Sequence, residues 1–379
     1  MRLLGRHNMG MNPLSGLPLR QHPDVAVPSL DQPAVLLGGL SPSDFMQQHW
    51  QRAPLLVRQA LPAVQPPLTR AELFKLAEGE EVESRLVTRR GRGADEVWQL
   101  ERGPLQRRRL PPLKQPDWTV LVQGLDQHLP SAQAMLAQFR FIPQARLDDL
   151  MISWAAEGGG VGPHFDSYDV FLVQEWVLSP GDMLYLPPGW AHDGDAVGGE
   201  CMTCSVGFRS PLRSELARET LLRLADAVED EGDEGVRPVV YADPGQPATA
   251  EPGRIPADLV RFAADGLRRV MEEAGALERA LGEYLSEPKP TVSFDFGEPL
   301  PADCGVVLDA RSCMLYDESH VFMNGDSWHA AGDDALVLRQ LADARRLDAT
   351  ILLAASGAVR GLLEQWCDDG WVHPLTSHE

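Results

Sequence analysis

The chain has 379 residues, of which 44% are apolar and 23% are charged, and its formal net charge is −21. The length and apolar content favour two or three folded domains and exclude a disordered protein. The excess of acidic residues argues against nucleic-acid binding, because contacts to phosphate need basic side chains. It favours a basic partner, although the same charge would also serve solubility alone.

The sequence predicts neither a membrane span nor a secretory signal. No apolar run approaches the roughly 20 residues that span a bilayer, and residues 1–20 lack the apolar stretch of a signal. Five cysteines are too few for a disulfide framework, so we expect a cytoplasmic protein. Cys201 and Cys204 have C-x-x-C spacing, but an offset of three in a strand places them on opposite faces. This favours a structural role over a redox or zinc role.

Short elements are predicted over the first 140 residues. Ser41 is typical of a helix N-cap, with Pro42 in the first turn. The hydrophobic pattern predicts strand 52–58, helix 68–77 opened by Thr69, a surface hairpin within 82–107, strand 117–123 and helix 130–139.

Residues 147–154 alternate with a period of two, which predicts a strand with Asp149, Met151 and Ser153 on one face. If this face lines a metal cavity, an acidic, an apolar and a hydroxyl side chain line up along it. Alternatively, Asp149 ends the strand at an edge in solvent.

The chain is organised around residues 158–174, which read GGGVGPHFDSYDVFLVQ. His164 and Asp166 form an H-x-D pair, and side chains two residues apart on a strand project to the same side. Residues 179–192 then read SPGDMLYLPPGWAH, which predicts a turn, an apolar strand, a second turn and a histidine. The spacing G-x5-P-x-G-x2-H resembles the second motif of the cupin superfamily.

A third metal ligand is predicted at His192. A lone histidine is more often structural than a ligand, but both motifs together place His192 beside His164 and Asp166, because the two ligand-bearing strands of a double-stranded β-helix are neighbours. Two imidazoles and one carboxylate on one face are typical of non-haem Fe(II) oxygenases.

Residues 146–174 and 175–211 together resemble the JmjC-type ribosomal oxygenases, whose bacterial members include enzymes that hydroxylate an arginine of large-subunit ribosomal protein sixteen. The resemblance implies Fe(II), with 2-oxoglutarate and O2 as cosubstrates. It implies that His164, Asp166 and His192 bind the iron and that Ser153 helps to bind 2-oxoglutarate. It further implies that the substrate pocket is lined by Asp149, Met151 and Tyr168. An acidic group beside apolar and aromatic surface also suits a guanidinium on an aliphatic stem.

The spacing between the two motifs departs from this family. Residues 167–191, 25 in all, separate Asp166 from His192. A double-stranded β-helix needs several strands there, and the family has a strand pair after the position of Gln174, where a basic residue grips the distal carboxylate of 2-oxoglutarate. Either a stretch of roughly 30 residues is omitted, for about four strand-and-turn units, or a deletion has removed cosubstrate binding.

The second half of the chain is predicted to be largely helical, then mixed. The sequence predicts an amphipathic helix over residues 212–230, an acidic linker over 229–256 and further helix over 255–286. The resemblance implies a homodimer here, against the alternative of a helical cap packed on its own barrel. Residues 291–379 resemble the winged-helix domain of the family, but their fifteen acidic and five basic residues argue against direct DNA binding.

The expected fold is therefore α+β: a double-stranded β-helix (JmjC/cupin barrel), a helical dimerisation region and a winged-helix-like domain. The expected boundaries are an N-terminal extension over 1–29, the barrel over 30–211, the helical region over 212–290 and the last domain over 291–379. The expected function is hydroxylation of an arginine in a basic ribosomal protein. The alternatives are the same chemistry on a histidine or a methylated lysine, an inactive cupin-type binding module, and a DNA-binding regulator with a sensory barrel.

Overall fold

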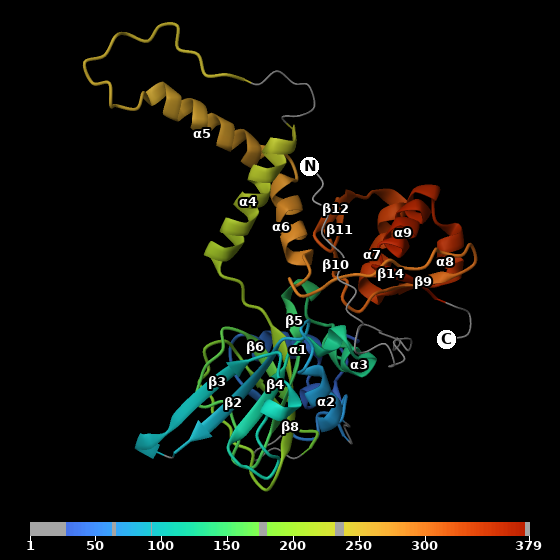
Figure 1. The fold of residues 1–379 in the computed structure, drawn as a ribbon. Helices are drawn as coiled ribbons and strands as arrows, with labels where there is room; N and C mark the ends of the chain where they lie inside the picture. The colour runs from blue at the N-terminus through green and yellow to red at the C-terminus, as the bar shows by residue number, and fades with distance from the viewer. Residues whose placement is uncertain (1–27, 63–65, 92, 174–179, 232–238, 376–379) are drawn as a thin grey trace.

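The structure of this protein, a computed structural model, describes residues 28–62, 66–91, 93–173, 180–231 and 239–375. Figure 1 shows a β-sheet domain, a region of three helices and a C-terminal domain of helices and short strands. None of the helices in the described ranges combines the length and apolar character that a membrane crossing requires. The expected fold class is confirmed by this arrangement and by the relatives reported below.

The first domain is built on one antiparallel sheet of eight strands, in the order β1-β7-β6-β8-β5-β4-β2-β3. The strands are β1 (Leu55–Val57), β2 (Ser84–Arg90), β3 (Val97–Arg102), β4 (Trp118–Val122), β5 (Leu147–Ala155), β6 (Asp169–Val173), β7 (Met183–Leu186) and β8 (Cys201–Phe208). Five 3-10 turns lie at Val35–Leu37, Gly93–Asp95, Arg107–Arg109, Leu125–Gln127 and Gln144–Arg146. The predicted strands and the predicted hairpin are thus confirmed.

Three short helices cover one face of this sheet: α1 (Pro42–Gln48), α2 (Arg70–Leu76) and α3 (Pro130–Ala137) (Figure 1). The Ser41 side chain accepts a hydrogen bond from the Asp44 amide, and Thr69 forms a capping box with Glu72, as their types predict. The main hydrophobic core lies between helices and sheet, and it includes the buried aromatic residues Phe45, Phe74, Trp118, Trp154, Phe171, Tyr185 and Phe208.

The opposite face of the sheet, which we call the inner face, carries the candidate site residues of β5. Leu150, Ile152 and Trp154 point into the core, so Met151 and Ser153 alternate onto the inner face. The register pairs Ser153 with Thr203 of β8 on one side and with Leu121 of β4 on the other. Leu121 in turn pairs with Arg85 of β2.

A second, much smaller layer lies against the inner face and consists of residues 158–164 and 192–196. Two antiparallel bridges join these segments, Gly160 with Asp195 and His164 with His192. The Thr119 hydroxyl donates to the carbonyl of Gly160 at 3.0 Å and ties this layer to β4. Within the described residues this second layer thus consists of two short segments that are tied to the sheet at β4.

The helical region consists of α4 (Arg213–Glu231), α5 (Ala257–Glu272) and α6 (Ala276–Ser286). The single helical stretch expected over 255–286 is wrong in one respect, because Gly275 adopts a left-handed φ of 80° and starts α6 in a new direction. Figure 1 shows α5 reaching away from the two other parts of the molecule, while α6 leads toward the C-terminal domain.

The C-terminal domain has two three-stranded sheets, β10-β11-β12 and β13-β9-β14, around its own core. Its elements are β9 (Gly305–Leu308), β10 (Met314–Tyr316), β11 (His320–Met323), β12 (Asp326–His329), α7 (Gly332–Ala344), β13 (Arg346–Leu347), α8 (Ala349–Ala354), α9 (Gly357–Asp368) and β14 (Val372–Leu375). Asn324 and Gly325 form a tight turn between β11 and β12, with φ of 53° and 97°.

Candidate metal centre and neighbouring pocket

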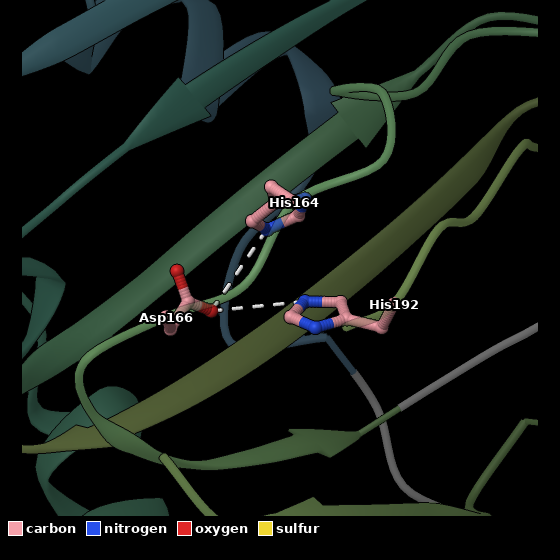
Figure 2. A group of neighbouring side chains, drawn as sticks. All are labelled: His164, Asp166 and His192. Atoms are coloured by element: carbon pink, nitrogen blue, oxygen red, sulfur yellow. Dashed lines mark ion pairs between the residues drawn. The ribbon is translucent and has the colours of Figure 1, made fainter. Parts of the chain in front are cut away.

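His164, Asp166 and His192 meet as predicted. One ligand atom from each lies within 4.8 Å of the other two. Asp166 Oδ2 lies 3.8 Å from His164 Nε2 and 3.6 Å from His192 Nε2 (Figure 2). The three side chains are 19–37% exposed, so the cluster opens to solvent on one side.

Both imidazoles are oriented by the backbone two residues before them. His164 Nδ1 lies 2.8 Å from the carbonyl of Gly162, and His192 Nδ1 lies 3.1 Å from that of Trp190. A carbonyl can only accept, so each Nδ1 carries the proton and each Nε2 keeps a free lone pair. This tautomer is the one that a metal ligand needs, and such bonds hold the ring in place.

The backbone brings the two histidines together. Each one donates its amide to the carbonyl of the other, at 3.0 and 2.8 Å. The amide of Gly189 also donates to the Asp166 carbonyl at 2.7 Å. Gly162 has a left-handed φ of 82°, and a Cβ there would lie 3.0 Å from the Trp98 ring, so the turn before His164 requires glycine.

Arg89 of β2 anchors the far end of the second layer. Its guanidinium donates to Asp195 at 2.9 and 3.0 Å, to Asp117 at 3.1 Å and to the carbonyl of Gly158. The side chain is 6% exposed, so its assignment to a surface hairpin is wrong. Since Asp195 is three residues beyond His192, Arg89 positions the segment that carries this histidine of the candidate metal centre.

Asp149 is the third residue of β5 and is only 3% exposed. The alternative that places it in solvent is therefore wrong. Its Oδ2 accepts from the Gly124 amide at 3.1 Å and from Lys289 Nζ at 2.8 Å. Burial raises the pKa of Asp149, and Lys289 opposes that shift. The predicted acidic side chain of the pocket therefore has a basic partner within the chain.

Tyr168 and Met151 lie near this pair. Tyr168 is 39% exposed. Burial raises the pKa of its hydroxyl, and the charges of Asp148 and Asp149 raise it further, whereas the charge of Lys289 lowers it. Met151 is half-buried on the inner face, one alternation along β5 from Asp149. The three predicted pocket residues thus lie on one side of the sheet.

Sequence reasoning missed three charged residues of this site. Arg89 stands among exposed arginines, and Lys289 is 140 positions from Asp149, so no local pattern connects either of them to the site. Asp126 accepts from the Leu150 amide at 2.9 Å. Burial and the charge of Asp149 raise the pKa of Asp126 to about 6.

The short connection between the motifs has a structural counterpart. β6 pairs directly with β7, from Val170 with Leu186 to Val173 with Met183. The connection contains Gln174, which lies outside the described residues together with 175–179. The inner face at this end is open, since Leu56 of β1 is 48% exposed.

Comparison with known proteins agrees with this geometry. A JmjC domain model matches residues 134–175 and 173–216, and a ROXA-like winged-helix model matches 270–373. The ribosomal protein uL16 3-hydroxylase of Escherichia coli K12 is 32% identical over 355 residues, 83% of this chain and 89% of that protein. This chain belongs to the JmjC-type ribosomal oxygenases.

Further relatives of this ribosomal oxygenase support the assignment. A probable ribosomal oxygenase of Haemophilus influenzae is 34% identical over 213 residues, 47% of this chain and 52% of that protein. The solved structure of YcfD, a ribosomal oxygenase from Escherichia coli in complex with cobalt and 2-oxoglutarate, superposes with a TM-score of 0.73 at 27% identity. It covers 89% of this chain and 99% of that one. A YcfD structure with cobalt and succinic acid gives 0.72.

As a 2-oxoglutarate-dependent oxygenase, the protein uses Fe(II) and 2-oxoglutarate, and its residues fit the metal. Two imidazole nitrogens and one carboxylate oxygen converge from one side, which leaves the other coordination positions for cosubstrates. The two JmjC matches overlap at residues 173–175, in the short connection between the two motifs.

The cysteines take no part in this site. None of the five forms a disulfide within the described residues. Cys204 lies in the main core, whereas Cys201 packs with Ala155 and Ala196 on the inner face. Burial raises the pKa of Cys204 to about 12, which keeps the thiol protonated. The opposite faces expected from the spacing are confirmed.

Proposed function

We propose that this oxygenase hydroxylates an arginine side chain of a large-subunit ribosomal protein. The proposal rests on one arrangement, the buried carboxylate of Asp149 with Met151 and Tyr168 on the inner face of the sheet, against which the segments with His164 and His192 lie. The name of the Escherichia coli relative, ribosomal protein uL16 3-hydroxylase, supports a ribosomal substrate. The net charge of −21 suits a basic protein of this kind.

The roles follow from the positions. His164, Asp166 and His192 hold the iron, with Nδ1 of each histidine fixed by a carbonyl. When bound, the iron supplies the oxidising chemistry that decarboxylates 2-oxoglutarate and hydroxylates an unactivated carbon. The remaining task of the protein is positioning, because the target carbon has to be held close to the metal for such a step.

Ser153 would help to bind 2-oxoglutarate, and Arg85 is our candidate for its distal carboxylate. Both lie in one cross-strand row, Arg85–Leu121–Ser153–Thr203. Arg85 stands two strands from Ser153, about 10 Å between backbones. Its Nε is buried and has no hydrogen-bond partner among the described atoms, although Nη2 bonds to Glu83 and Gln123. Binding of 2-oxoglutarate to the Arg85→Gln variant, measured by calorimetry, tests this.

The substrate arginine would extend its stem past Met151 and Tyr168 and place its guanidinium on Asp149. A guanidinium binds a carboxylate through two parallel hydrogen bonds, which fixes the direction of the side chain. Mass spectrometry of the ribosomal protein with and without the enzyme tests the proposal. We expect +16 Da on one arginine; a hydroxylated histidine or a demethylated lysine would replace this proposal with its alternative.

A second candidate, an inactive cupin-type binding module, is favoured by the direct pairing of β6 with β7. It predicts metal binding without 2-oxoglutarate turnover. Succinate formation in the presence of Fe(II), O2 and substrate decides between the two functions. An intact mass equal to 41.6 kDa would show that no stretch is omitted between the motifs.

We propose that the protein is a homodimer formed through α5. All sixteen residues of α5 are described and none is buried, while Val260, Leu267 and Met271 are 55–67% exposed. These three share one helical face, seven and four positions apart. An apolar stripe of this kind suits burial against a second copy better than solvent. Phe262 instead packs on Tyr241.

Other expectations stay proposals. We propose the domain boundaries after residues 29, 211 and 290, a cytoplasmic location, and no direct DNA binding by the winged-helix domain. The last rests on the excess of acidic residues over 291–379, fifteen against five basic ones. An electrophoretic mobility assay with duplex DNA at low salt tests it, since a shifted band would contradict the proposal.

A further inference from the structure

Lys289 forms an ion pair with Asp149, whose carboxylate binds the substrate arginine in the proposed function. Its Nζ lies 2.8 Å from Asp149 Oδ2 and 3.3 Å from Asp148 Oδ1. The lysine belongs to the segment just after α6, which connects the helical region to the C-terminal domain. A cation from one part of the chain is thus seated on the acidic pocket of another.

The pair is held away from water. The side chain of Asp149 is 5% exposed and that of Lys289 is 25% exposed. Burial alone would lower the pKa of Lys289, but the charges of Asp149 and Asp148 outweigh it and raise the pKa. The ammonium is therefore charged at neutral pH, and it balances a carboxylate that would otherwise be buried without a cation.

The choice of lysine is unusual in this chain, which has three lysines among its 34 basic residues. An ammonium is a compact point charge, whereas a guanidinium binds a carboxylate through a planar fork. A substrate arginine can thus form two hydrogen bonds where Lys289 forms one. An internal arginine at this position would be a much stronger competitor.

We propose that Lys289 is an internal occupant of the substrate arginine seat, by which we mean the carboxylate of Asp149. The guanidinium of the incoming substrate displaces Lys289 from this carboxylate. The inference rests on the proposed role of Asp149 as the substrate anchor. After displacement the ammonium still has an acidic partner, because Asp148 Oδ1 already lies 3.3 Å from Lys289 Nζ. Asp148 and Lys289 also line a cavity of about 130 Å³ between the first and last domains, which gives the side chain room to move.

The occupant sets the affinity for substrate. If the seat is free in only about a tenth of the molecules, the apparent Kd is about tenfold higher than that of an empty seat. Lys289 also makes the pocket selective for charged side chains. A neutral side chain such as citrulline cannot replace the ion pair with Asp149 and therefore gains no binding energy from this carboxylate. Lys289 is then a specificity-determining residue rather than a catalytic one.

Lysine-selective labelling observes the displacement directly. With 13Cε-lysine the full-length protein gives signals from Lys75, Lys114 and Lys289 alone. We expect an arginine peptide from the ribosomal protein to shift the Lys289 signal and to leave the other two unchanged, with cobalt in place of iron to prevent turnover. An unmoved Lys289 signal at saturating peptide would overturn the inference.

Variants separate this inference from the proposed function. Lys289→Gln should bind the peptide about tenfold more tightly and lower KM with kcat unchanged, whereas Lys289→Arg should bind it more weakly than the natural protein. Lys114→Gln, at an exposed position, is the matched control. Equal affinities for all three variants would refute the internal occupant.

Asp149→Asn tests the underlying assignment. It should abolish peptide binding in the presence and in the absence of Lys289. If Asp149→Asn binds normally, the arginine seat itself is wrong. If it abolishes binding while Lys289→Gln has no effect, the proposed function stands and Lys289 is a structural ion pair only. Should Lys289→Gln fail to fold, the Lys289→Arg variant and the labelling experiment still decide.

Discussion

His164 and His192 are joined by two reciprocal backbone hydrogen bonds, of 3.0 and 2.8 Å, and their ring centroids lie 4.2 Å apart. The backbone therefore holds the two histidines of the candidate metal centre side by side. Each ring is then turned by a carbonyl two residues earlier, so both Nε2 atoms face Asp166. If these residues bind the iron as proposed, fixed rings of this kind lower the ordering cost of metal binding.

Replacing either histidine with alanine should abolish metal binding and 2-oxoglutarate turnover. Loss of an outer partner of a ligand costs 10–100-fold, so loss of a ligand should cost more than about 100-fold in turnover. Metal content after anaerobic loading and succinate formation are the measurements. His329→Ala, an exposed site on β12, is the control, and unchanged turnover of the His164 variant would refute the ligand assignment.

Gly162→Ala should weaken metal binding about tenfold without removing a ligand. The added Cβ requires a left-handed φ of 82° and meets the Trp98 ring, so the carbonyl that orients His164 must shift. Titration with cobalt, followed by its absorption, gives the affinity. Gly194→Ala serves as control, because a Cβ there meets no atom within 4 Å; equal losses in both would contradict the explanation.

Arg89→Met should lower the free energy of unfolding by about 2–3 kcal/mol. The substitution removes four hydrogen bonds, three that join β2 to the two segments of the second layer at Asp195 and Gly158, and one to Asp117. Urea denaturation measures the loss, and Arg90→Met at the neighbouring exposed position should stay within about 0.5 kcal/mol. Metal affinity should fall with Arg89→Met as well. An unchanged metal affinity would show that Arg89 stabilises the fold without positioning the segment of His192.

Asp126 should make the protein less stable as pH rises from about 4 to about 6. Its folded pKa of about 6 lies above the ordinary aspartate value of 3.8, so the folded state binds more protons in this window. The penalty is complete above pH 6 and amounts to at most about 3 kcal/mol. Asp126→Asn keeps an acceptor for the Leu150 amide and should raise Tm at pH 8 but not at pH 4. An equal gain at both pH values would contradict this origin.

Leu267→Glu should convert the proposed dimer into a monomer. Leu267 is 67% exposed on the apolar face of α5, and a buried carboxylate there would have no partner. Light scattering after gel filtration measures the mass. Arg268→Glu, on the neighbouring face with its side chain 59% exposed, is the control. A natural protein that elutes as a monomer would dismiss the proposal.

Local patterns were sufficient for most elements and for the three residues that meet in the candidate metal centre. The N-caps Ser41 and Thr69 act through the first turn of their own helices, so their residue types are informative without tertiary structure. His164 and Asp166 are two residues apart, and His192 is placed by a turn motif. In each case the information lies within about fifteen residues.

The pairs that connect distant segments could not be predicted in this way. Nothing in residues 82–107 distinguishes Arg89, which is buried, from Arg90, which is exposed. Asp149 has the correct face by periodicity, but its partner Lys289 depends on how α6 meets the start of β5. Ion pairs across the fold are set by packing, and a single sequence does not encode their partners locally.

The direct pairing of β6 with β7 also affects how the site folds. His164 and His192 are 28 positions apart in the sequence, and roughly 30 further residues in the connection would double the loop that an iron ion closes. Each doubling costs about 0.6 kcal/mol of loop-closure entropy. A metal held by His164 and His192 would therefore close its loop at a slightly lower entropic cost across this short connection.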